Sequence, residues 1–184
     1  MRLFAAVPIP EPARGEIARL LARLREPGWP LRLVHDQGVH LTVKFFGEVP
    51  PARLEVIEEA VRAAVPGTGA LPLRLAEIGA FPNVRRPRII WVGLEAPPAL
   101  ELLQDRLERR AEAIGFPPEG TPFRPHVTLA RVREGQRLPP GALDSLANQY
   151  QPVEFLASEL VLYESVSASG GPRYEPRLTM ELAS

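Results

Sequence analysis

Two short stretches of the chain carry the same pattern, His40-Leu41-Thr42-Val43 and His126-Val127-Thr128-Leu129. Each has a histidine followed two positions later by a threonine, within an otherwise apolar run. Side chains alternate between the two faces of a β-strand, so the histidine and threonine of each copy share one face. The apolar residues share the other face, which must be covered by the rest of the fold, whereas the polar face is costly to bury without partners. The repeat therefore predicts two similar strands whose polar faces line a common groove.

The segments around these strands alternate between helical and extended patterns. Apolar residues at helical spacing predict helices over 12–24, 52–65 and 99–114, and a short helix over 140–146. Apolar runs or strict alternation predict strands over 3–7, 31–34, 39–46, 71–78, 89–94, 123–132, 159–165 and 177–182. This order predicts an α+β fold with two lobes of antiparallel sheet related by a pseudo-twofold axis, helices on the outer faces and a central cleft. No long linker divides the chain, so residues 1–184 are expected to form a single domain of two intertwined lobes.

Composition narrows the functional classes. The 22 basic and 22 acidic residues balance, which argues against a basic coat for non-specific nucleic-acid binding. Cysteine is absent, so disulfides, thiolate metal sites and cysteine nucleophiles are excluded. The apolar run at Met1–Pro8 is too short for a signal peptide or a membrane span. A cytoplasmic protein without membrane contact is therefore expected.

A matched pair of histidines suits acid–base chemistry at a phosphodiester. In-line displacement needs a base on the attacking side and an acid on the leaving side, and two related lobes would supply one histidine to each. Hydroxyls of Thr42 and Thr128 would donate hydrogen bonds to the non-bridging oxygens. Zinc is the competing interpretation, but two histidines are too few and no carboxylate recurs beside them, so neither metal nor cofactor is expected. A lone histidine on a strand is usually structural, which is how we interpret His35.

The repeat and its neighbours resemble the 2H phosphoesterase superfamily, and within it the RNA 2',3'-cyclic phosphodiesterases, also called 2'-5' RNA ligases. The resemblance is carried by 2–6, 40–47, 81–83, 86–88, 124–131 and 162–165. It implies metal-independent hydrolysis of an RNA 2',3'-cyclic phosphate to a 2'-phosphomonoester, and a reverse reaction that would ligate RNA through a 2'-5' bond. By the same analogy His126 is the proton acceptor and His40 the proton donor.

Other candidate substrate-binding residues have two interpretations each. Arg131 stands where the family has an arginine, yet strict alternation places it opposite His126, so either the strand bulges there or the residue is structural. Phe46 shares the His40 face by alternation and would stack on a base, or pack in the core. Arg85, Arg86 and Arg88 would contact phosphates, or belong to a solvated loop.

Three functions follow in order of preference. The first is hydrolysis of RNA with a 2',3'-cyclic phosphate end. The second is hydrolysis of a cyclic phosphate on a small nucleotide or on ADP-ribose. The third is RNA binding without catalysis, against which the neutral charge and the repeated histidine both count. The sequence leaves the oligomeric state open.

Overall fold

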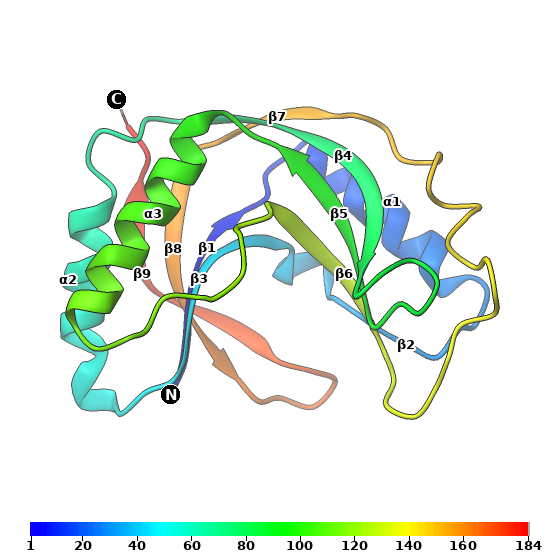
Figure 1. Ribbon diagram of the computed structural model, residues 1–184, viewed down its shortest axis with the longest axis horizontal. Coiled ribbons are helices and arrows are strands. Elements are labelled where there is room, and N and C mark those ends of the chain that lie inside the picture. The colour runs from blue at the N-terminus through cyan, green and yellow to red at the C-terminus, as the bar shows by residue number, and fades with distance from the viewer. Residues whose placement is uncertain (184) are drawn as a thin grey trace.

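The computed structural model describes residues 1–183, over which three α-helices and nine β-strands form (Figure 1). In chain order these are β1 (Arg2–Pro8), α1 (Ala13–Arg25), β2 (Leu31–Leu33), β3 (His40–Glu48), α2 (Leu54–Ala64), β4 (Leu71–Phe81), β5 (Ile89–Glu95), α3 (Pro98–Ala113), β6 (His126–Val132), β7 (Glu154–Ala157), β8 (Glu159–Val166) and β9 (Arg173–Glu181). Two short 3₁₀ turns, Asp36–Gly38 and Pro51–Arg53, precede β3 and α2. None of the helices in this part of the chain is long and apolar enough to cross a membrane.

All nine strands belong to one curled sheet of antiparallel pairs, in the order β7-β4-β5-β6-β3-β1-β8-β9, with β2 paired to β6. The two His-x-Thr strands, β3 and β6, lie side by side at the middle of this order. In the described part of the chain, only Leu41 and Val127 are paired between them. This junction divides the sheet into one lobe with β6 and His126 and another lobe with β3 and His40. The predicted α+β fold with two lobes is thus confirmed, and the lobes share one continuous sheet.

The helices cover the outside of the curl (Figure 1). Helix α1 follows β1 in the chain but contacts β2 and β6 in the other lobe, whereas α3 follows β5 and contacts β3. The apolar residues of α1 and α3 at helical spacing are fully buried, among them Leu20, Leu21, Leu103 and Leu107. Because α1 and α3 each pack on strands of the opposite lobe, the helix-covered core defines the outer side of the sheet.

The structure differs from the sequence expectations at four places. Residues 140–148 form consecutive turns and not a helix, because Gly141 has a φ of +72°, which a right-handed helix does not allow. The edge strand β7 was not predicted, because its four residues are too few to show a clear alternation of apolar and polar side chains. The second motif strand begins at His126 and not at residue 123, and β9 begins earlier than expected, at Arg173.

Candidate active site

Both His-x-Thr strands carry a β-bulge at the fourth residue of the motif. The pairing register skips Val43 in β3 and Leu129 in β6. A bulge places two consecutive side chains on one side, so the alternation reverses after it. The burial patterns agree, since each strand has a half-buried histidine and threonine, two consecutive buried residues, and then exposed Phe45 or Arg131. The same deviation therefore occurs at the same position in both lobes.

The bulges decide which later residues share the histidine face. Arg131 returns to the face of His126, so the bulged alternative for this strand is confirmed. The expectation that Phe46 shares the His40 face is wrong, because the bulge turns Phe46 inward. There its ring packs edge-on against Phe116 with centroids 5.2 Å apart. Phe45 takes the outward position instead.

Both imidazoles are oriented by the backbone in the same way. His40 Nδ1 lies 2.6 Å from the carbonyl oxygen of Gly38, and His126 Nδ1 lies 2.7 Å from that of Arg124. A carbonyl oxygen only accepts, so each Nδ1 carries a hydrogen and donates it. In the neutral ring, Nε2 then carries no hydrogen and has a free lone pair. Each histidine therefore has the tautomer that makes Nε2 the reactive nitrogen.

Aromatic rings enclose His40 on its own lobe. Phe4 from β1 lies 4.9 Å from the imidazole centroid, and Tyr174 from β9 meets the ring edge-on at 5.2 Å. Tyr163 from β8 is 6.4 Å away and stacks on Phe4. Burial raises the pKa of both tyrosines, so their hydroxyls stay protonated at neutral pH. Sequence reasoning missed these residues, because only the order of β3, β1, β8 and β9 brings them beside His40.

The other lobe surrounds His126 with two rings. Phe81 at the end of β4 meets the imidazole edge-on at 5.2 Å, and Trp91 from β5 lies 6.0 Å away. The indole lies flat against Gly79, where any Cβ would come within 2.3 Å of the ring. Glycine at this position therefore makes room for Trp91 beside the histidine.

The two histidines interact electrostatically. Burial lowers the pKa of His40, the hydrogen bond to Gly38 opposes this, and the charge of protonated His126 lowers it further. The positive charges of Arg131 and Arg2 lower the pKa of Tyr174 and so oppose the effect of burial. Thr42 and Thr128 are half-buried on the histidine face of their strands. His40 and His126 are thus close enough for their charges to interact, and Thr42 and Thr128 lie on the histidine faces of the two strands.

The comparisons with known proteins agree with this geometry. The family model of the 2'-5' RNA ligase superfamily matches residues 9–168. The chain belongs to the 2'-5' RNA ligase superfamily. It is 35% identical over 175 residues to the RNA 2',3'-cyclic phosphodiesterase of Aeropyrum pernix, covering 92% of this chain and 97% of that one.

Solved structures of the superfamily superpose over the whole chain. A protein of Thermus thermophilus matches with a TM-score of 0.83 at 28% identity, covering 100% of this chain and 98% of that one. Escherichia coli LigT in complex with 3'-AMP matches with a TM-score of 0.77 at 27% identity and the same coverage. The resemblance inferred from the repeated motif is therefore confirmed.

In this superfamily member, the remaining arginine candidates are not all at the groove. Arg88 donates to the carbonyl oxygens of Val132, Arg133 and Gln136, at 2.9 to 3.4 Å, and so holds the segment after β6 in place. Arg85 and Arg86 are exposed, and their backbone N–H groups donate to Asn83 Oδ1. Arg88 thus has a structural role that neither sequence interpretation included, and Arg85 and Arg86 belong to an exposed turn.

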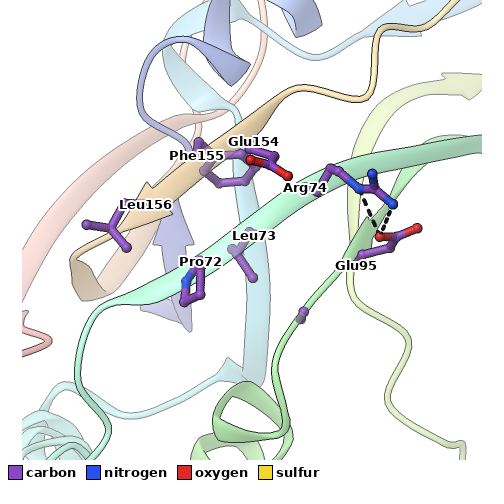
Figure 2. A pocket seen from close by; sticks show the side chains of 8 residues that line it. Pro72, Leu73, Arg74, Glu95, Glu154, Phe155 and Leu156 are labelled. Carbon is purple, nitrogen blue, oxygen red and sulfur yellow. Dashed lines mark hydrogen bonds and ion pairs between the residues drawn. The ribbon is translucent and has the colours of Figure 1, made fainter.

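A separate hollow lies away from the motif residues. It has a volume of about 590 Å³ and lies between β4, β7 and the end of β5 (Figure 2). Its polar side chains are Arg74, Glu95 and Glu154, and Arg74 donates to Glu95 at 2.9 Å. No histidine lines it, and within residues 1–183 no cluster of three or more His, Asp or Glu side chains is placed to hold a metal ion. The hollow therefore contains none of the motif residues.

Proposed function

We propose that this protein hydrolyses RNA 2',3'-cyclic phosphodiester ends to 2'-phosphomonoesters by metal-independent catalysis with His40 and His126. The observation that carries the proposal is the matched pair of imidazoles, each with Nδ1 bonded to the backbone carbonyl two residues earlier. Relatives named RNA 2',3'-cyclic phosphodiesterase, about a third identical over most of the chain, support the substrate. The whole chain acts as one domain, because each lobe contributes one histidine to the same groove.

The reaction assigns one proton transfer to each histidine. His126 Nε2 accepts a proton from water while the water oxygen forms a bond to phosphorus. The bond from phosphorus to O3' breaks, and protonated His40 Nε2 donates its proton to O3'. The products are a 2'-phosphate and a free 3'-hydroxyl. Hydroxyls of Thr42 and Thr128 and the guanidinium of Arg131 stabilise the charge that develops on the non-bridging oxygens.

The lowered pKa of His40 suits a proton donor. An imidazolium with a lower pKa is a stronger acid and transfers its proton more readily to a leaving alkoxide. The negative charge of the bound phosphate opposes the desolvation of the imidazolium and so favours the charged ring in the complex. The enclosed lobe thus makes His40 a strong acid only when the substrate is in place.

The same site supports ligation. A 5'-hydroxyl in place of water would attack the cyclic phosphate, the bond from phosphorus to O3' would break with protonation of O3', and a 2'-5' bond would form, driven by release of ring strain. RNA is made and processed inside the cell, so the cytoplasm is the proposed compartment. RNA with a 2',3'-cyclic end is the proposed partner in both reactions.

The test is a product assay. An oligoribonucleotide ending in a 2',3'-cyclic phosphate is incubated with the protein in the presence of EDTA, and the new end is identified. A 2'-phosphate end is expected, and its formation should be lost in both His40→Asn and His126→Asn while circular dichroism stays unchanged. Turnover that needs added metal, or a 3'-phosphate product, would overturn the proposal.

A further inference from the structure

A large groove opens beside His40. It has a volume of about 1020 Å³ and is bounded by β2, the segment 34–38, the end of β6 and the β8–β9 connection. This is at the upper end of the range for small-molecule sites, about 300–1,000 Å³. The tip of the β8–β9 connection is held in place by His35, whose Nε2 lies 2.7 Å from the carbonyl oxygen of Gly170. The third histidine therefore forms part of the groove wall and lies outside the catalytic pair.

The groove is continuous with the catalytic site. Tyr174 lines the groove and also meets the His40 ring edge-on at 5.2 Å. Gly38 lines it too, and its carbonyl oxygen accepts the hydrogen bond from His40 Nδ1. Arg131, on the histidine face of β6, lines the same space. A chain-like ligand whose end lies between the histidines can therefore continue into this groove.

The groove concentrates positive charge in a chain whose net charge is zero. Four arginines line it, Arg32, Arg131, Arg133 and Arg173, and no aspartate or glutamate does so among residues 1–183. Arg173 is bonded to Glu175 at 2.6 Å, whereas no carboxylate of the described chain lies within ion-pair distance of the other three. Such a surface attracts a ligand with several negative charges.

The pairing register sharpens this argument. Arg32 on β2 lies directly opposite Arg131 on β6, so the two side chains are on the same face. Like charges directly opposite each other destabilise an antiparallel pair. An anion between the guanidinium groups would reverse this repulsion, and a phosphodiester matches the guanidinium geometry. The arrangement is costly in the free protein and favourable with a phosphate bound.

We propose that this groove binds the RNA strand on the 5' side of its cyclic end, with Arg32 and Arg133 contacting successive phosphodiesters. The inference rests on the proposed function, which places the cyclic phosphate between the histidines. Because the cyclic phosphate is the 3' end of the strand, all further phosphates of the substrate lie on its 5' side. The groove therefore makes a polynucleotide a better substrate than a mononucleotide.

Binding without turnover provides the first test. Fluorescence anisotropy would compare a hexaribonucleotide and a dinucleotide, both labelled at the 5' end and ending in a 3'-phosphate. The hexamer should bind about tenfold more tightly at about 50 mM salt, and this advantage should disappear in Arg32→Gln/Arg133→Gln. The slope of log affinity against log salt should decrease by about 1.4, since each phosphate contact on a single strand contributes about 0.7.

A matched control keeps the change in net charge equal. Arg109→Gln/Arg110→Gln removes two exposed arginines from α3, which packs against the outer side of the sheet. This variant should keep the hexamer advantage within about twofold. Equal binding of the two oligonucleotides by the wild type, or an equal loss in both double variants, would overturn the groove proposal.

Kinetics separates this proposal from the proposed function. The ratio of kcat/KM for a cyclic-ended hexamer to that for a mononucleotide 2',3'-cyclic phosphate should decrease about tenfold in Arg32→Gln/Arg133→Gln. A wild type that turns over both substrates at equal kcat/KM would overturn the groove alone. A wild type that binds the hexamer with the expected slope but cleaves neither substrate would overturn the proposed function and leave the groove supported.

Discussion

The two His-x-Thr strands have nearly the same backbone but different surroundings. β3 and β6 share the motif, the bulge at its fourth residue and the hydrogen bond from Nδ1 to a backbone carbonyl. These shared features orient two imidazoles in the same way. The geometry that the proposed acid and base require is therefore built twice by the same local structure.

The differences begin just after the motif. On the helix-covered side, buried Lys44 in β3 corresponds to Ala130 in β6, and on the groove side Phe45 corresponds to Arg131. Lys44 Nζ is bonded to Glu108 on α3, whereas Arg131 extends toward the arginine-rich groove. The comparison indicates that the repeated backbone provides position, while the residues that follow it assign a different task to each lobe.

Removal of either imidazole should have the largest effect on activity. His40→Asn and His126→Asn are each expected to lower kcat by about 10³-fold or more, because each removes one of two coupled proton transfers. The double variant should lose much less than the product of the two, since the pair acts as a unit. Single-turnover rates on a cyclic-ended oligonucleotide measure this, and either single variant within tenfold of the wild type contradicts the assignment.

Substitution of the buried Lys44 tests how much its ion pair with Glu108 contributes to the stability of the β3 lobe. Lys44 is 2% exposed and lies 3.0 Å from Glu108, so Lys44→Met leaves a carboxylate without its partner in a mostly buried position. The free energy of unfolding in urea should decrease by about 3 kcal/mol. Lys44→Met/Glu108→Leu should recover part of this loss, because it removes the unpaired charge as well.

An exposed ion pair provides the control for this measurement. Arg109 and Asp105 on α3 are 2.9 Å apart and both exposed, so Arg109→Gln should cost less than about 1 kcal/mol. If Lys44→Met lowered the free energy of unfolding no more than Arg109→Gln does, the buried pair would contribute no more to stability than an exposed pair.

Arg131 tests the asymmetry on the groove side. Arg131→Gln is expected to lower kcat/KM for a mononucleotide 2',3'-cyclic phosphate about 100-fold, because it removes a positive donor to the non-bridging oxygens. Phe45→Leu, at the equivalent position of β3, should have a much smaller effect on the same substrate. Equal losses in the two variants would mean that the lobes do not divide these tasks.

The smallest effect is expected from opening the aromatic enclosure of His40, which should shift the pKa of its imidazole. Tyr174→Ala admits water to the ring and is expected to raise the pKa of His40, because burial is the main cause of its lowered value. Titration of the imidazole Cε1–H signals by NMR measures the shift. An unchanged or lower midpoint for His40 would show that the aromatic ring does not cause the depression.

The same lowered pKa affects folding. Since the pKa of His40 is lower in the folded protein than in the unfolded chain, near 6.5, the unfolded chain binds more protons at acid pH. Stability from this group is present above about pH 6.5 and is lost as the pH decreases through the folded pKa. Urea unfolding from neutral to acid pH should therefore show a weaker pH dependence in His40→Asn than in the wild type.

Sequence reasoning reached the motif residues but not their neighbours. Alternation placed His40 with Thr42 and His126 with Thr128 correctly, because the strands are regular up to those threonines. It failed for Phe46, since the bulge at Val43 reverses the faces and the apolar residues around it give no signal. The one hint was Lys44, the only lysine in the chain, within an apolar run.

Residues from distant strands were beyond reach for a different reason. Phe4, Tyr163 and Trp91 approach the histidines only through the order of the strands in the sheet. One sequence does not contain that order in any local pattern. The wrong helix at 140–146 had the opposite cause, because its apolar spacing was real but Gly141 adopts a positive φ.

The bonds from both Nδ1 atoms to backbone carbonyls leave Nε2 as the only nitrogen of each ring that exchanges protons with the substrate. After one hydrolysis by the proposed route, His40 has lost its proton and His126 has gained one. The site is then the mirror image of its starting form and is prepared for the reverse reaction. Exchange with water must restore the first form before the next hydrolysis. Until that exchange takes place, the protonation states of the two histidines thus record the direction of the last reaction.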